Sequence, residues 1–462
     1  MMETKITANR QKLIYLLMIT LIFSAMSGTI FNIVLPQISE EFELSISEVS
    51  WISSAYGLIY AIGAVTYGKL ADLYKLKKLL TIGLLLFAGG SLLGLVSQTF
   101  WLILVARCLQ AMGAAAIPAT AMIIPIRYFP PKNRGYASGM AASGLAIGTA
   151  VGPIISALII SIAHWRWLFS ITLLILLVLP FYRKYLGDEV GEGGSFDWIG
   201  CLSLCGTIVM LLLGVSNGSW FFLAGSLLFL ILFIARIQKA TDPFIQPKLF
   251  KNKQYTFSLV LFFLVNAIGY SLYFLSPILL SAVQNLSSNW IGFALVPAAV
   301  ASAVLGRKGG SLADKKGTSY LFFIASGLLI ICFLLLFTFT ESSPIWIAGF
   351  LISGNVGQTF MMIAMTLFVS FILPKEQTGV GMGLLSMTNF ISASIATGIY
   401  AKIVDIGANN HINPLVSDSS SFIYSNIYFV LFILHAGILL TYYFMIAKGY
   451  RNKVQLNTRI KA

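Results

Sequence analysis

Charge is scarce in this chain, and negative charge is the scarcest. Only 10% of the 462 residues are charged and only 16 are Asp or Glu, whereas 58% are hydrophobic. Soluble globular domains carry about 25% charged residues. Because the mean hydropathy is also +0.88, the composition excludes an ordinary soluble protein. We expect an all-α membrane protein with the lipid bilayer as its surroundings.

Cysteine and histidine are also few, with four and three residues. All four cysteines lie inside apolar runs, which argues against a disulfide framework and against a zinc site. We therefore expect neither a metal nor a cofactor. The chain has no HExxH or GxSxG motif, so the sequence offers no support for an intramembrane enzyme.

Long apolar runs are abundant. A transmembrane helix needs about 20 mainly apolar residues, and fourteen runs of this kind can be counted. Their approximate extents are 13–36, 50–70, 78–97, 101–127, 137–161, 166–183, 198–215, 219–236, 255–280, 290–312, 319–338, 344–370, 378–404 and 422–447. The net charge of +14 could suggest a nucleic-acid partner, but the bases stand in short clusters between the runs. That pattern is typical of membrane topology, so we exclude nucleic acid.

The basic residues predict the orientation of the runs. If the N-terminus is cytoplasmic, all but three of the 30 Lys and Arg residues fall on the cytoplasmic side, the exceptions being Arg107, Arg166 and Lys402. The first external segment, 39–48, contains four Glu and no base. Because Lys and Arg collect in cytoplasmic loops, we expect a multi-pass protein with both termini in the cytoplasm.

A short motif occurs twice and divides the chain. "GKLAD" ends in Asp72 and "GSLAD" ends in Asp314, so Gly68 corresponds to Gly310. Six runs precede the pair at 198–236 and six follow it. Repeated bundles are typical of transporters. The predicted parts are an N-terminal six-helix bundle at 1–185, an inserted two-helix hairpin at 186–240, and a C-terminal six-helix bundle with a cytoplasmic tail at 241–462.

These motifs carry a family resemblance over essentially the whole chain. It resembles the fourteen-helix drug:proton antiporters of the major facilitator superfamily and is most similar to their tetracycline-efflux branch. The matching residues are Gly68, Leu70, Asp72, Lys77 and Lys78 after the second run, Arg107, Gln110 and Gly113 in the fourth, and Gly144, Gly148, Gly152 and Pro153 in the fifth. The resemblance implies two six-helix bundles plus two inserted helices, in a cell membrane. It further implies export of a small molecule by alternating access, with a proton as possible coupling ion.

Several of the matching residues are candidates for a conformational switch. Gly144, Gly148 and Gly152 recur every four residues, which permits close helix contact, and Pro153 permits a bend. This face is either a tight packing contact or a hinge. Asp72 and Asp314 are either solvated loop residues or, as the resemblance implies, latches that tie one half to a helix end of the other. The glycines Gly68 and Gly310 belong to the same predicted switch.

The acids of the tetracycline branch are missing here. Ser27 and Gly28, Thr149, and Ala393 stand where that branch has Asp or Glu, and none of the 16 acids falls in a mid-membrane position. Acids inside membranes cost about 2.5–3.5 kcal/mol on insertion scales and are normally kept for proton relays or cation binding. The usual proton carrier is therefore absent.

Neutral polar residues and one arginine remain within the apolar runs. They either line a substrate cavity or only pack between helices. The candidates are Asn32, Arg107, Gln110, Tyr270, Asn355, Gln358 and Asn389. The first functional hypothesis is efflux of an amphipathic small molecule by a monomer. The alternative is a carrier of an anionic or neutral metabolite, such as a lipid-like acid or a siderophore, with Arg107 selecting the charge.

Overall fold

The computed structural model describes residues 2–31, 34–44, 46–49, 51–187, 195–217, 219–284, 286, 288–374, 377–408, 410 and 412–461, and this part of the chain is all-helical. The α-helices are α1 (Met2–Thr29), α2 (Leu35–Glu41), α3 (Ile46–Val49), α4 (Trp51–Leu73), α5 (Leu76–Leu95), α6 (Phe100–Ala114), α7 (Ala116–Tyr128), α8 (Arg134–Ile160), α9 (Leu168–Leu173), α10 (Leu179–Tyr185), α11 (Trp198–Asn217), α12 (Trp220–Lys239), α13 (Lys248–Lys251), α14 (Lys253–Ala282), α15 (Ser288–Lys316), α16 (Thr318–Thr338), α17 (Pro344–Ile372), α18 (Thr378–Ile406) and α19 (Ser419–Lys461). Three short 3₁₀ segments are η1 (Pro131–Asn133), η2 (Trp165–Trp167) and η3 (Leu174–Val178).

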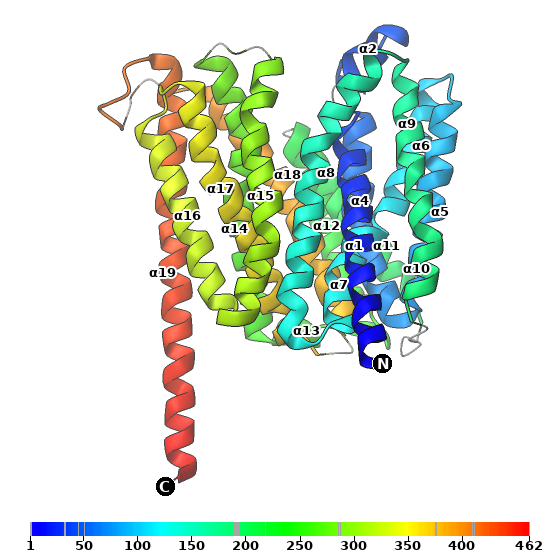
Figure 1. Cartoon of the computed structure of the whole chain (residues 1–462), viewed down its shortest axis with the longest axis vertical. Coiled ribbons are helices and arrows are strands. Elements are labelled where there is room, and N and C mark those ends of the chain that lie inside the picture. Colours follow the sequence, from blue (N-terminus) through cyan, green and yellow to red (C-terminus); the bar gives the residue numbers. More distant parts are fainter. Residues whose placement is uncertain are drawn as a thin grey trace.

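The long helices form two groups that lie side by side (Figure 1). In the first group, α1 packs on α8, and α6 packs on α4 and α5; in the second, α17 packs on α15 and α16, while α14 packs on α18. The groups meet along two helix pairs, α8 with α15 and α4 with α18. Because Gly68 and Asp72 of α4 correspond in sequence to Gly310 and Asp314 of α15, the two contacts are built from repeated elements.

Twelve helical segments of the described residues are long and apolar enough to cross a membrane. The count of fourteen is therefore not confirmed. The two predicted runs that are not among the twelve are 50–70 and 198–215, which lie in α4 and α11. The continuous apolar helix counted in α11 is short, Trp198–Leu211, and a run of fewer than about 17 residues does not by itself span a bilayer. α4 carries two charged residues, Lys69 and Asp72, near its end.

The first run is also shorter than the predicted 13–36. α1 ends at Thr29, and a separate short helix, α2, begins at Leu35 with Pro36 in its first turn. A proline is tolerated there because the first N–H groups of a helix have no partner within the helix, whereas inside a helix it removes a hydrogen bond. Asn32 lies outside the described residues.

The inserted pair forms an antiparallel hairpin. Asp197, just before α11, accepts hydrogen bonds from Arg236 Nε (3.0 Å) and from the backbone nitrogen of Phe244 (3.2 Å). Burial raises the pKa of Asp197, but these donors and the backbone nitrogen of Gly200 outweigh it and hold the pKa below its ordinary value. α11 contacts both α4 and α18. The hairpin therefore lies against the place where the two groups meet.

The two ends of the molecule contain different elements. α1 begins and α19 ends at the same end, and α2 lies at the opposite end (Figure 1). Asp72 and Asp314 stand in the last turns of α4 and α15. We call their end the latch end, and the end that holds α2 the α2 end.

Candidate functional site

Asp72 connects the two groups of helices at the latch end. Its two carboxylate oxygens accept hydrogen bonds from the backbone nitrogens of Gly379 and Val380, each at 2.8 Å, in the first turn of α18. Arg127 of α7 pairs with the same carboxylate at 2.9 Å. The free N–H groups and the dipole at a helix N-terminus favour an anion. The carboxylate therefore holds α4 against the beginning of α18.

Asp314 makes the corresponding contact from the other group. Its oxygens accept hydrogen bonds from the backbone nitrogens of Gly135 and Tyr136, both at 2.7 Å, at the beginning of α8. Two repeat-related carboxylates thus cap two helices of opposite groups. Whether these contacts open during a transport cycle stays a prediction.

Glycines allow the helices that carry these carboxylates to come close. A Cβ atom built on Gly310 would overlap the carbonyl of Gly135 and lie 3.1 Å from Cα of Gly139. A Cβ atom on Gly68 would lie 2.9 Å from Cα of Gly383. Any side chain at these positions would force the two groups apart, because backbone atoms cannot turn away as a flexible side chain can.

Gly144, Gly148 and Gly152 face a different neighbour. A Cβ atom on Gly144 would lie 2.6 Å from the carbonyl oxygen of Met18, and one on Gly148 would overlap that of Ile22. A Cβ on Gly152 would overlap the hydroxyl of Thr29. These glycines therefore pack α8 on α1 within one group. Pro153 lies in the same helix, and a hinge role for this segment stays a prediction.

Arg107 is enclosed within the first group of helices and has no exposed surface. Its Nη1 donates to the backbone oxygen of Ser27 (3.2 Å) and to Oε1 of Gln110 (2.9 Å). The Cζ atom lies 4.0 Å from the ring centre of Tyr56 and 4.5 Å from that of Phe31. Placed this way, Arg107 does not present its charge to an open cavity.

The interactions of Arg107 offset only part of the cost of burying a charge. Hydrogen bonds to a charged group contribute about 1.5–3 kcal/mol each, and a desolvated cation–π contact contributes about 2 kcal/mol. Arg107 forms no ion pair with any described residue. Its Nε and Nη2 atoms are buried without a hydrogen-bond partner in the described part of the chain.

Gln110 and its counterparts in the second group serve helix packing in this structure. Gln110 Nε2 donates to the hydroxyls of Ser91 (2.7 Å) and Thr172 (3.1 Å) on neighbouring helices. Asn355 and Gln358 repeat the three-residue spacing of Arg107 and Gln110. Asn355 donates to the carbonyl of Leu351 in its own helix, and Gln358 donates to Asn266 Oδ1 at 3.0 Å. All are buried.

Partly exposed polar and aromatic side chains gather where the groups meet between the two ends. Phe390 of α18 meets Tyr60 of α4 edge to face at 4.8 Å between ring centres, and Asn389 precedes it. Tyr270 packs edge to face on Tyr273, which is 50% exposed. Of the predicted cavity residues that the structure describes, Tyr270 and Asn389 are thus the ones with accessible surface.

Sequence analysis missed the residues that contact across the two groups at this level. Besides Tyr60, they are Met122 and Ser386, whose Sδ and Oγ atoms lie 3.1 Å apart. The sequence feature that could have indicated this contact is the pair Tyr56 and Tyr60, which stand one helical turn apart in a run of small and aliphatic residues. A further small hollow between α4 and α11 is lined by Thr66, Cys201, Cys205 and apolar residues, and no predicted cavity residue lines it.

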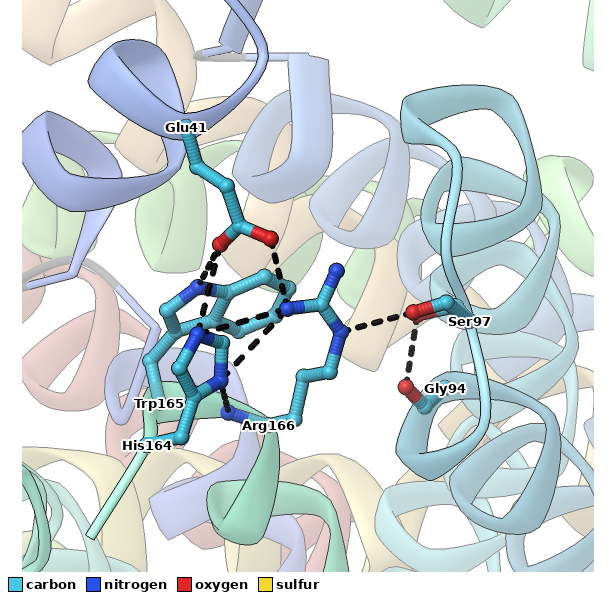
Figure 2. A network of polar contacts seen from close by, with 6 residues as sticks. All are labelled: Glu41, Gly94, Ser97, His164, Trp165 and Arg166. Carbon is cyan, nitrogen blue, oxygen red and sulfur yellow. Dashed lines mark hydrogen bonds and ion pairs between the residues drawn. The ribbon is translucent and has the colours of Figure 1, made fainter.

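A polar network ties the loops at the α2 end (Figure 2). Glu41 accepts hydrogen bonds from Trp165 Nε1 and Arg166 Nη1, each at 2.7 Å, and Arg166 Nε donates to the backbone oxygen of Ser97 at 2.6 Å. Burial raises the pKa of Glu41, but the hydrogen bonds from Trp165 and Arg166 outweigh it and keep the pKa below its ordinary value. The network joins α2, the segment that follows α5, and η2 just before α9, all within one group.

Known proteins share this architecture. "Multidrug resistance protein 3" of Bacillus subtilis (strain 168) is 27% identical over 361 residues, 74% of this chain and 70% of that protein. "Riboflavin transporter RibZ" of Clostridioides difficile (strain 630) is 26% identical over 463 residues, 94% of this chain and 98% of that protein. A crystal structure of the human organic anion transporter MFSD10 matches with a TM-score of 0.68 at 14% identity, covering 92% of this chain and 99% of that one, and shows the fold alone. Residues 17–397 of this chain match the sequence model of the Major Facilitator Superfamily. The chain therefore belongs to the Major Facilitator Superfamily, a family of membrane transporters and not of enzymes.

Proposed function

We propose that this protein is a secondary active transporter that exports an amphipathic small molecule by alternating access. The observation that carries the proposal is the pair of latches, in which Asp72 and Asp314 each cap a helix of the opposite group. Such contacts can exist only while the latch end is closed. Breaking both would let the two groups rotate apart there, which alternating access between two related bundles requires.

The latch end is the cytoplasmic end in this proposal, so the described conformation is closed to the cytoplasm. Support comes from the clusters of Lys and Arg that follow α4 and end α15. Both chain ends lie there as well. We place the protein in the cell membrane as a monomer, with both termini in the cytoplasm.

We further propose that α4 and α11 also cross the membrane, which makes fourteen spans. α11 runs beside α12, one of the twelve segments, from the Asp197–Arg236 pair to the contact of Gly214 with Leu223. α4 is a helix of 23 residues that begins just after α2 and α3 at the α2 end and finishes at Leu73, next to Asp72, at the latch end. These lengths support two six-helix bundles at 1–185 and 241–462 with a two-helix hairpin at 186–240 between them.

The cargo of this proposal is an amphipathic molecule bound between the groups, near Tyr60, Tyr270, Asn389 and Phe390. Aromatic side chains and the neighbouring Met122 can adapt to ligands of different shape. The relative named "Multidrug resistance protein 3" supports export of drug-like molecules. We propose the proton as the coupling ion because of the family resemblance. Transport driven by an imposed pH gradient would test this coupling.

A neutral metabolite is the second candidate cargo. The relative named a riboflavin transporter aligns over nearly its whole length and supports this alternative. Direct selection of an anionic cargo by Arg107 has less support, because the enclosed guanidinium has no surface that a cargo molecule could touch in this conformation.

Uptake into inverted membrane vesicles tests the proposal. A panel of cationic, neutral and anionic amphipathic compounds would be assayed with and without an imposed inside-acid pH gradient. Gradient-driven accumulation of one class, lost in Asp72→Asn, supports proton-coupled export. Asp242→Asn is the matched control, because Asp242 is exposed and accepts a hydrogen bond only from Ser195 of the hairpin region among the bonds described. Accumulation equal to that of vesicles lacking the protein, for every compound, contradicts export.

A further inference from the structure

We propose that the Arg107 guanidinium binds one small monovalent anion, with chloride as the defining ligand, inside the first group of helices. The site is distinct from the cargo site between the groups. It consists of the Nε and Nη2 edge of Arg107, which is fully buried and has no hydrogen-bond partner in the described part of the chain. A guanidinium in a protein stays protonated, so Arg107 cannot avoid the free-energy cost of burying a charge by losing its proton.

None of the described groups that contact Arg107 balances its charge. The rings of Tyr56 and Phe31 contact the guanidinium at 4.0 and 4.5 Å from their centres, and Ser27 and Gln110 accept from Nη1 alone. Every one of these groups is neutral. No described carboxylate lies within ion-pair distance.

The enclosure also limits the size of the ligand. Arg107, Ser27 and Phe31 have no exposed surface, and Tyr56 is 4% exposed. Such enclosure favours a small ion, such as chloride or formate, over a large organic anion. Gly28 follows Ser27 in the chain, and a Cβ atom built there would approach the Tyr56 ring at 3.9 Å among the described residues.

Thermal unfolding of the purified, full-length transporter tests the site without any transport assay. The midpoint would be measured in sodium chloride, sodium formate and sodium gluconate at equal ionic strength. We expect a saturable rise of a few degrees in chloride relative to gluconate, since a ligand that binds only the folded state stabilises it. A rise in formate too identifies a general small-anion site; a rise in chloride alone identifies a halide site.

Two variants assign the effect to Arg107. Arg107→Gln removes the charge and should abolish the chloride response. Ser27→Asp keeps Arg107 and places a carboxylate next to Nη1, so it should also abolish the response while the protein stays folded in gluconate. Arg183→Gln, at an exposed arginine of α10, should respond to chloride as the unmodified protein does.

The proposal is overturned if the unmodified protein shows no difference between chloride and gluconate, or if Ser27→Asp responds to chloride fully. Because Ser27→Asp retains the arginine, the test holds even where Arg107→Gln does not fold. The readout is the unfolding midpoint, so failed export by a protein that binds chloride would count against the proposed function and not against the anion site.

Discussion

The Asp314 carboxylate lies 2.7 Å from the backbone nitrogen of Gly135, across the boundary between the two groups of helices and 179 residues away in the chain. Asp72 and Gly379 repeat the arrangement at 2.8 Å in the other direction. Each contact joins the last turn of one helix to the first turn of another. Two carboxylates and four backbone N–H groups therefore join the two groups of helices at the latch end.

Replacing Asp314 with Asn should favour opening of the latch end. An amide retains one acceptor oxygen, but it loses the charge that strengthens two hydrogen bonds, each contributing about 1.5–3 kcal/mol. We expect the distance between spin labels at Lys132 and Lys316, on opposite groups, to shift toward longer values. Asp242→Asn should leave the distribution unchanged. An unaltered distribution in Asp314→Asn would remove this carboxylate from the closure.

Gly310→Ala should reduce transport several-fold at near-normal abundance. The added methyl would overlap the Gly135 carbonyl, and overpacking of this kind costs about 1–3 kcal/mol. The cost falls on the closed conformation only, because the two groups separate at this point when the end opens. The matched control is Gly327→Ala in α16, where a Cβ atom would meet nothing within 4 Å. Normal transport by Gly310→Ala would show that close glycine contact is not needed.

Gly144→Ala and Gly152→Ala should reduce transport more than abundance, with Gly144→Ala the more severe. At Gly144 the new methyl meets the backbone oxygen of Met18 at 2.6 Å, whereas at Gly152 it meets mainly the hydroxyl of Thr29, which can rotate. Gly89→Ala, with open space around it, is the control. Transport and quantity of protein in the membrane would be measured together. The reverse order of severity would contradict the packing described for α1 and α8.

With α4 counted as a span, cysteine labelling tests whether α11 also crosses the membrane. In a background without the four native cysteines, Ser219→Cys lies in the turn between α11 and α12, and Lys239→Cys lies at the end of α12. We expect a membrane-impermeant maleimide to label position 219 only from outside and position 239 only from the cytoplasmic side. Labelling of position 219 from the cytoplasm would mean that α11 does not cross.

Glu41→Gln should reduce stability in a pH-dependent way. The pKa of Glu41 is held below its ordinary value in the folded protein, so its carboxylate stabilises the fold above the ordinary carboxyl range. That contribution is lost as the pH falls through the lowered pKa. Because Glu41 is about one-third exposed, we expect at most about 1 kcal/mol at neutral pH. The unfolding midpoints of variant and unmodified protein should converge in acid. A constant difference across the pH range would contradict this role.

Much of the architecture follows from the sequence because lipid imposes simple requirements. A membrane span must be a long apolar helix, and basic loops mark one side. The repeated Gly68/Asp72 and Gly310/Asp314 motifs indicate two related halves without any structure. The predicted extent of the first span, 13–36, was wrong, because the apolar run continues beyond Thr29, where α1 ends. Hydropathy measures solubility in lipid and does not determine where a helix stops.

The candidate site could be predicted only in part. The sequence, together with the family resemblance, shows that no acid stands at the positions where the tetracycline branch has Asp or Glu. Only the tertiary structure places the rings of Phe31 and Tyr56 against Arg107, because Phe31 lies in the segment after α1 and Tyr56 lies in α4. The partners of Asp72 and Asp314 in the opposite group of helices are backbone N–H groups, which every residue except proline possesses. A sequence therefore does not show which N–H groups will bind a carboxylate. The packing of α4 on α18 and of α15 on α8 decided which helix ends receive Asp72 and Asp314.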